Sequence, residues 1–191
     1  MQALILASSS AYRRALLERL RLPFEVARPA TSEATVEGEL APDRAIRLSL
    51  AKAQAVAAYH PGAVVIGSDQ VASVGNAILD KPGTAQACQK QLAELSGSSA
   101  RFHTGCAVLG ARGERLVHLD TTTVRFRSLS PEEIARYVRL EEPFDCAGGF
   151  KAEALGIALF DSVESKDPTA LIGLPLIWLA EALRNVGFAV P

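Results

Sequence analysis

Short apolar runs alternate with amphipathic stretches along the chain. The runs at residues 4–7 and 64–66 are uninterrupted, which is typical of strands that are buried on both faces. Between and after these runs, apolar residues recur at helical spacing. The helices that this spacing predicts span residues 11–20, 42–59, 85–95, 131–140 and 176–185. Strands that alternate with helices predict an α/β fold.

Antiparallel elements are expected where turn signals separate β-favouring stretches. Gly75-Asn76 lies between two short strand-like runs and is a two-residue hairpin signal. Two longer stretches rich in β-favouring residues meet around residues 110–113 and predict a second hairpin. The expected strands outside the two apolar runs span residues 24–27, 71–74, 77–79, 100–109, 114–127 and 156–160.

The first candidate for chemistry follows the apolar run at 64–66. This run stops at Gly67, and Ser68-Asp69-Gln70 comes directly after it. Ligands of open α/β sheets collect just past the carboxyl ends of strands, so Asp69 is expected where a reacting group of an enzyme would lie. The alternative is that these polar residues form only a turn at the end of a core strand.

A second candidate is the turn between the first strand and the first helix. Ser8-Ser9-Ser10 offers an N-cap, and Arg13-Arg14 lies in the first helical turn. The helix dipole disfavours a cation there by ~0.3–1 kcal/mol, and a bound anion would reverse that sign. The pattern therefore favours a phosphate site, and two solvated arginines are the alternative. Neither a Walker A motif nor a GxGxxG motif occurs.

Three further features leave two interpretations open. Lys52 has apolar neighbours one turn away on either side, so its ammonium either extends along the surface to solvent or reaches into a site. Lys81 follows the return arm of the first hairpin, which would bring it near Asp69. The stretch 143–153 carries a glycine pair, a lysine and carboxylates without a regular period. It is either a ligand-binding loop or a mobile surface loop.

Composition narrows the class of protein. The chain has 191 residues, 49% of them hydrophobic, which suits one domain with a sizeable core. A formal net charge of −1 argues against nucleic acid and anionic membranes as partners. No apolar run approaches the ~20 residues of a membrane span, and the N-terminus lacks the basic region of a signal peptide. Three widely spaced cysteines argue against a disulfide framework and a thiolate zinc site. A cytoplasmic protein is therefore expected.

The motifs together resemble those of the Maf-like proteins. The resemblance rests on residues 8–14, Gly67-Ser68-Asp69-Gln70, Lys81-Pro82 and residues 146–151, which stand in the order and spacing of that family nearly from end to end. It implies a nucleoside triphosphate pyrophosphatase. Ser-Asp-Gln after the strand and Phe-Lys-Ala-Glu in the late loop look most like the 7-methyl-GTP branch. The branch that acts on dTTP and UTP typically has Ala-Asp-Thr and a glutamine at these places.

The resemblance also implies roles for individual residues. Asp69 matches the catalytic carboxylate and, together with Glu33, the ligands of a divalent cation, Mg²⁺ or Mn²⁺. The residues at the positions that set base specificity are Tyr12, Gln70 and Glu153, and those at the positions that hold phosphates are Ser10, Arg13, Lys52 and Lys81. The chain departs from the family pattern at Ala11, Ser32 and Asp80, where proline, aspartate and glycine are common, and at Tyr12, where this branch often has tryptophan.

The expected activity is metal-dependent hydrolysis of the α–β link of a nucleoside triphosphate, with water as the nucleophile. By the resemblance the substrate is 7-methyl-GTP. Two alternatives stay open: the same hydrolysis on another modified or pyrimidine triphosphate, and a nucleotide-binding regulator of septum formation in cell division. The expected fold is a single α/β domain, residues 1–191, with a twisted mixed β-sheet flanked by helices and two lobes around a central cleft. A homodimer is compatible with it.

Overall fold

The computed structural model describes residues 2–191, which divide into two compact units. Unit 1 contains the described residues up to Gln70, together with His103–Asp120 and Asp167–Pro191. Unit 2 contains Val71–Phe102 and Thr121–Lys166. The chain therefore passes from one unit to the other four times, and each unit is built from segments far apart in the sequence.

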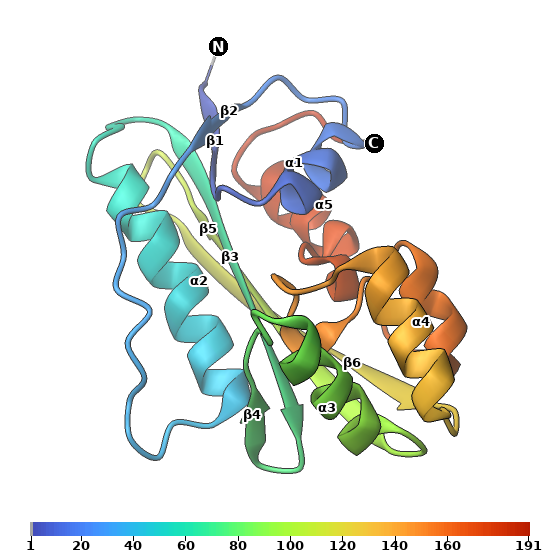
Figure 1. Cartoon of the computed structure of the whole chain (residues 1–191). Coiled ribbons are helices and arrows are strands. Elements are labelled where there is room, and N and C mark those ends of the chain that lie inside the picture. Colours follow the sequence, from blue (N-terminus) through green and yellow to red (C-terminus); the bar gives the residue numbers. More distant parts are fainter. Residues whose placement is uncertain (1) are drawn as a thin grey trace. The chain divides into compact units, whose positions relative to one another are not determined.

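The strands of the described chain form a mixed sheet, so the expected mixed α/β fold is confirmed. The strand order is β2-β1-β3-β5-β6-β7, and β4 pairs with β3. β1 is parallel to both β2 and β3, whereas the β3/β4 and β6/β7 pairs are antiparallel. The strands are β1 Leu4–Ala7, β2 Glu25–Ala27, β3 Val64–Val74, β4 Ala77–Leu79, β5 Ser99–Leu109, β6 Arg115–Phe126 and β7 Phe160–Glu164 (Figure 1).

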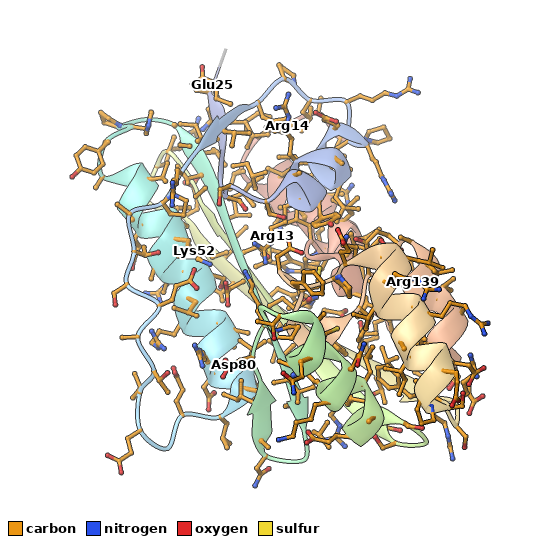
Figure 2. All side chains as sticks on the ribbon, viewed as in Figure 1. Arg13, Arg14, Glu25, Lys52, Asp80 and Arg139 are labelled. Carbon is orange, nitrogen blue, oxygen red and sulfur yellow. The ribbon has the colours of Figure 1, made fainter. Side chains whose placement is uncertain are left out.

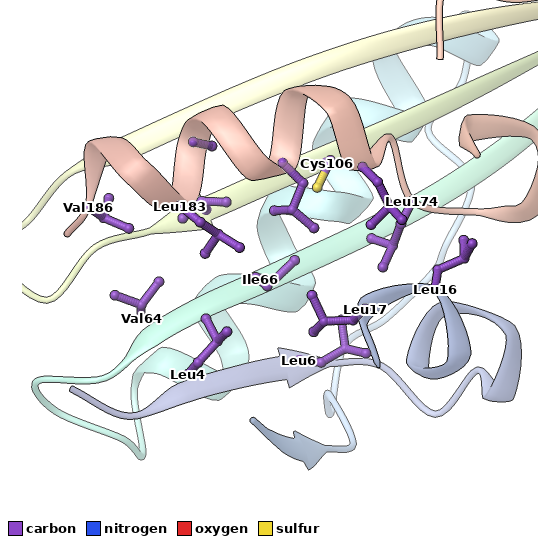
Figure 3. Close-up of a cluster of buried hydrophobic side chains, with 14 residues drawn as sticks. Leu4, Leu6, Leu16, Leu17, Val64, Ile66, Cys106, Leu174, Leu183 and Val186 are labelled. Carbon is purple, nitrogen blue, oxygen red and sulfur yellow. The ribbon is translucent and has the colours of Figure 1, made fainter. Parts of the chain in front are cut away.

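The central strands of unit 1 are buried on both faces. Alternate residues of a strand point to opposite faces, and β1 follows this rule. Leu4 and Leu6 pack into a cluster with residues of α1 (Ala11–Glu18) and α5 (Leu176–Asn185), shown in Figure 3. Ile5 and Ala7 pack into a second cluster with residues of α2 (Ala41–Ala57). Both faces of this strand are thus covered by helices, which explains why its apolar run is uninterrupted.

Two glycines allow α2 to lie close to the sheet in unit 1. A Cβ atom on Gly67 of β3 would stand 2.2 Å from the Ser49 carbonyl oxygen and 2.6 Å from the Ala53 nitrogen. A Cβ atom on Gly105 of β5 would stand 2.3 Å from the Ala45 carbonyl oxygen. Gly67 therefore marks a close approach of helix and strand. The prediction that the strand ends at this glycine is wrong, because β3 continues to Val74.

Unit 2 contains α3 (Ala85–Leu95), α4 (Pro131–Glu141) and a core of four phenylalanines. The rings of Phe102, Phe126, Phe150 and Phe160 meet edge to face, with centroids 4.9–5.5 Å apart. α4 begins with a capping box, in which the Ser130 hydroxyl accepts from the Glu133 N–H and the Glu133 carboxylate accepts from the Ser130 N–H. The expected hairpin at Gly75-Asn76 is also present, with Val74 paired to Ala77.

One predicted strand is wrong. Residues 156–160 were expected to be extended, but Leu155–Leu159 forms a 3-10 helix and β7 begins only at Phe160. The Ala154 and Gly156 N–H groups both donate to the Lys151 carbonyl oxygen, which coils the chain just before this point. A short apolar run is compatible with either conformation, and the preceding turn decides between them. Two further 3-10 helices span Ala147–Gly149 and Ala170–Ile172.

Candidate functional site

The centre of the candidate site in unit 1 is a lysine that bridges two carboxylates. Lys52 reaches from α2 so that its Nζ lies 2.5 Å from Asp69 Oδ1 and 2.7 Å from Glu33 Oε1. Lys52 and Asp69 are both 8% exposed, whereas the Glu33 side chain is 59% exposed. Asp69 was expected just past the end of a strand. It lies within β3 instead, because the strand continues beyond Gly67. The alternative in which Lys52 extends to solvent is wrong.

Arg13 is anchored in the same unit through its Nε atom. Nε donates to the Gly173 carbonyl oxygen at 3.0 Å, and Ser10 caps α1 by accepting from the Arg13 N–H at 3.4 Å. Burial lowers the pKa of the Arg13 guanidinium, and the negative charges of Asp69 and Glu33 oppose that shift. The guanidinium therefore lies within the electrostatic reach of both carboxylates. Figure 2 labels Arg13 on α1 and Lys52 on α2.

A loop near the C-terminus of unit 1 holds the polar residues on either side of Asp69. The Ser68 hydroxyl lies 2.8 Å from the carbonyl oxygens of both Gly105 and Gly173. Gln70 Nε2 lies 2.9–3.1 Å from Thr104 Oγ1 and from the carbonyl oxygens of residues 170 and 171. The amide nitrogen of Gln70 is thus used within the protein. Its expected role in reading the base, which would fall to the Oε1 atom, stays a prediction.

Two arginines that the sequence did not single out tie the Glu33 segment to α2. Arg47 forms a two-pronged ion pair with Glu39, with Nε–Oε1 at 2.5 Å and Nη2–Oε2 at 2.6 Å. This bond lowers the pKa of Glu39 and raises that of Arg47. Arg47 Nη2 also donates to the Ala34 carbonyl oxygen at 3.3 Å, and Arg44 Nη2 donates to the Glu33 carbonyl oxygen at 3.4 Å. A sequence signal for this contact was available: two arginines lie one turn apart on a helix that directly follows an acidic segment.

The remaining predicted residues divide between the units. Tyr12 is half-buried on α1 in unit 1. Lys81 and Glu153 belong to unit 2, and both are exposed. The structure thus groups Glu33, Lys52, Asp69 and Arg13, together with Ser10, in unit 1. That Lys81 and Glu153 act on the same substrate as these residues stays a prediction.

Comparison of the sequence with known proteins identifies the family of the chain. A family model described as Maf-like protein matches residues 3–186. The chain belongs to the Maf-like protein family. It is 53% identical, over 98% of its length and 97% of the relative's, to the 7-methyl-GTP pyrophosphatase of Aromatoleum aromaticum. It is also 53% identical to the protein of that name from Xanthomonas oryzae pv. oryzae, with both chains covered in full.

A solved structure supports the fold of this Maf-like protein. The structure of a HAM1 protein from Coxiella burnetii aligns with 97% of the chain and 100% of its own, with a TM-score of 0.50 and 16% identity. At that identity the likeness concerns the fold. In the described residues, no helix combines the length and the apolar character needed to cross a membrane.

The two carboxylates of this Maf-like protein fit one divalent cation in a particular way. Asp69 and Glu33 present oxygens around the same ammonium, so both can face one positive charge. Residues 2–191 contain no group of three or more His, Cys, Asp or Glu side chains that could hold a metal. Mg²⁺ is commonly bound through one or two carboxylates plus phosphate oxygens of the substrate and water. The donor set therefore fits a cation that arrives with a phosphorylated ligand.

The three cysteines are poor candidates for a nucleophile. Burial is the largest cause of a raised pKa at all three thiols: about 11 for Cys88 and about 12 for Cys106 and Cys146. A thiol is nucleophilic in its thiolate form, which these values make scarce at neutral pH. Cys88 and Cys106 are buried and serve as small residues of the core.

Proposed function

We propose that this Maf-like protein hydrolyses the α–β phosphate link of 7-methyl-GTP and releases the nucleoside monophosphate and pyrophosphate. The observation that carries the proposal is the ammonium of Lys52 held between Asp69 and Glu33, with Arg13 within the reach of both charges. The names of relatives that are 53% identical over nearly the whole chain support the choice of substrate.

The proposed chemistry depends on neutralising a highly charged substrate. A triphosphate carries several negative charges, and the leaving pyrophosphate must be stabilised as the α–β link breaks. Arg13 and Lys52 supply positive charge from unit 1, and Lys81 is proposed to add a third from unit 2. Arginine can bind two phosphate oxygens side by side through its guanidinium. Ser10 supports this role by capping the helix that carries Arg13.

Asp69 is proposed to act on the attacking water. Its carboxylate lies beside a cation in a buried environment and can accept a proton from water or align it against the α-phosphorus. A divalent cation held by Asp69 and Glu33 would supply further charge stabilisation when bound. Lys52, which neutralises both carboxylates, would then be drawn toward the phosphate oxygens. Lys52 would thus neutralise the carboxylates in the free protein and bind phosphate oxygens in the complex with substrate.

Recognition of the base is proposed to rest on Tyr12, Gln70 and Glu153. Tyr12 can stack on a purine, and the Glu153 carboxylate can accept hydrogen bonds from the N–H groups of guanine. A guanine methylated at N7 carries a positive charge, so a carboxylate suits it better than the neutral amide of glutamine. The exposure of Glu153 leaves this carboxylate accessible to a ligand.

The test is pyrophosphate release from a panel of 7-methyl-GTP, GTP, dTTP and UTP with Mg²⁺, in the wild type and in Asp69→Asn. The wild type should prefer 7-methyl-GTP, and Asp69→Asn should lower kcat by about 10²-fold or more. Asp161→Asn, an exposed aspartate on β7, is the matched control and should be unchanged. Full activity of Asp69→Asn would refute the mechanism. Binding of nucleotide without turnover in the wild type would favour a nucleotide-binding regulator.

A further inference from the structure

Glu141, the last residue of α4, holds both ends of the segment that carries Glu153. The Lys151 ammonium lies 3.0 Å from the Glu141 carbonyl oxygen and 3.4 Å from Glu141 Oε1. Glu141 Oε2 accepts from the Leu155 N–H at 3.1 Å. A single glutamate therefore binds the residue two positions before Glu153 and the residue two positions after it.

The segment is also closed by its own backbone. The Lys151 carbonyl oxygen accepts from the Ala154 N–H at 3.2 Å and from the Gly156 N–H at 3.1 Å. A Cβ atom on Gly156 would stand 2.4 Å from that carbonyl oxygen, so the turn can close this tightly only with glycine there. Glu153 thus occupies the exposed tip of a short loop whose two ends are held together.

The helix that supplies Glu141 is itself well fixed. Its N-terminus carries the capping box of Ser130 and Glu133, and its buried Tyr137 accepts from the Lys151 N–H through the phenol oxygen at 3.0 Å. The side chains of Lys151 and Glu141 are only 19% and 16% exposed, so the ion pair between them is sheltered from solvent screening. The loop is therefore attached to a rigid support at three points.

We propose that Glu141 is a positioning residue that determines base selectivity through Glu153. It fixes the loop in one conformation, and it also holds the Lys151 ammonium at the end of α4. Without Glu141, Lys151 would be able to pair with Glu153, two residues along the chain, and would neutralise the carboxylate that selects a positively charged base. The inference rests on the proposed function, because it concerns selection between 7-methyl-GTP and GTP.

The test compares kcat/KM for 7-methyl-GTP and for GTP in Glu141→Ala and Glu141→Gln. Glu141→Ala should lower the ratio of the two values by about tenfold, which corresponds to ~1.4 kcal/mol. Glu141→Gln can still accept from the Leu155 N–H but no longer neutralises Lys151, so its ratio should lie between those of the wild type and Glu141→Ala. Turnover of GTP should change less than turnover of 7-methyl-GTP, because Asp69 and Lys52 are untouched.

Two reference variants separate this inference from the function on which it rests. Glu153→Gln should lower the same ratio at least as strongly as Glu141→Ala. Glu94→Ala makes the same chemical change at an exposed glutamate that pairs with Lys90 at 4.0 Å on α3, and it should leave the ratio unchanged. If Glu153→Gln lowers the ratio and Glu141→Ala does not, the inference is wrong and the function stands. If the wild type shows no preference for 7-methyl-GTP, the proposed function fails first.

Discussion

Two pairs of predicted site residues, one from each unit, differ in their exposure to solvent. In unit 1, Lys52 and Asp69 are buried on a helix and a strand, and Arg13 is anchored by a backbone carbonyl. In unit 2, Lys81 and Glu153 are exposed, in segments outside helices and strands. Groups that must act on the reacting bond benefit from rigid, poorly solvated positions. Glu153, which is proposed to help distinguish one base from another, can lie at the exposed tip of a loop, because changing that side chain disturbs few other contacts.

The largest expected effect follows from removing the buried ammonium of Lys52. Lys52→Met leaves the buried carboxylate of Asp69 without its partner, and breaking a buried pair in this way costs about 3–5 kcal/mol. Pyrophosphate release should fall to background as well. Urea unfolding measures the first effect and the nucleotide assay the second. Lys90→Met is the control, because its exposed pair with Glu94 is worth ~1 kcal/mol at most. Equal stability of the two variants would contradict the contrast between buried and exposed charge.

An intermediate effect is expected at Gly173, whose carbonyl anchors Arg13. Its φ is +127°, and an added Cβ would stand 3.2 Å from Arg13 Nε and 3.3 Å from Arg13 Cγ. Gly173→Ala should therefore displace the guanidinium and raise KM for nucleotides by roughly tenfold, the factor that ~1.4 kcal/mol of lost binding produces. Gly113→Ala carries a similar backbone penalty, with φ +94° and no atom within 4 Å, and should leave KM unchanged. A similar KM in both variants would show that Arg13 does not depend on this contact.

The smallest effect is expected from modifying the cysteines. Because burial raises the pKa of Cys88 to about 11 and that of Cys106 to about 12, both stay as neutral thiols as pH rises through 8. Iodoacetamide at pH 8 should therefore label these two residues very slowly in the native protein and leave activity unchanged. Labelling after unfolding in urea provides the positive control, read by mass spectrometry. Activity lost in proportion to labelling would place a thiol in the reaction.

Much of the fold could be predicted from local pattern. The predicted helices at 85–95 and 176–185 and the strand at 4–7 agree with α3, α5 and β1 residue for residue. Each has a strong local signal: a capping threonine, a proline just before the helix, or an uninterrupted apolar run. The segment 155–159 was mispredicted because its conformation depends on bonds to Lys151 that no local period reveals.

The family resemblance selected the residues of the candidate site, whereas the contacts between these residues depend on packing. Spacing alone left Lys52 free to reach solvent or a site, and only the closeness of α2 to β3 settles that it meets Asp69. The support that Arg47 gives to the Glu33 segment also depends on a tertiary approach, in this case between a loop and a helix face. Such contacts depend on how helices, strands and loops pack together, and the local sequence around one residue does not indicate which residue it will contact.

The contact of α2 with Gly67 has a consequence for how mutations will be tolerated. Ala53, whose nitrogen a Cβ on Gly67 would meet at 2.6 Å, is the neighbour of Lys52, and Asp69 stands two residues beyond Gly67 on the same strand. The distance between the backbones of α2 and β3 therefore determines how close the Lys52 ammonium lies to the Asp69 carboxylate. A methyl group at Gly67 would push α2 away from β3 and separate Lys52 from Asp69, although neither charged side chain had been changed. The geometry of the charged pair thus depends on a position that has no side chain.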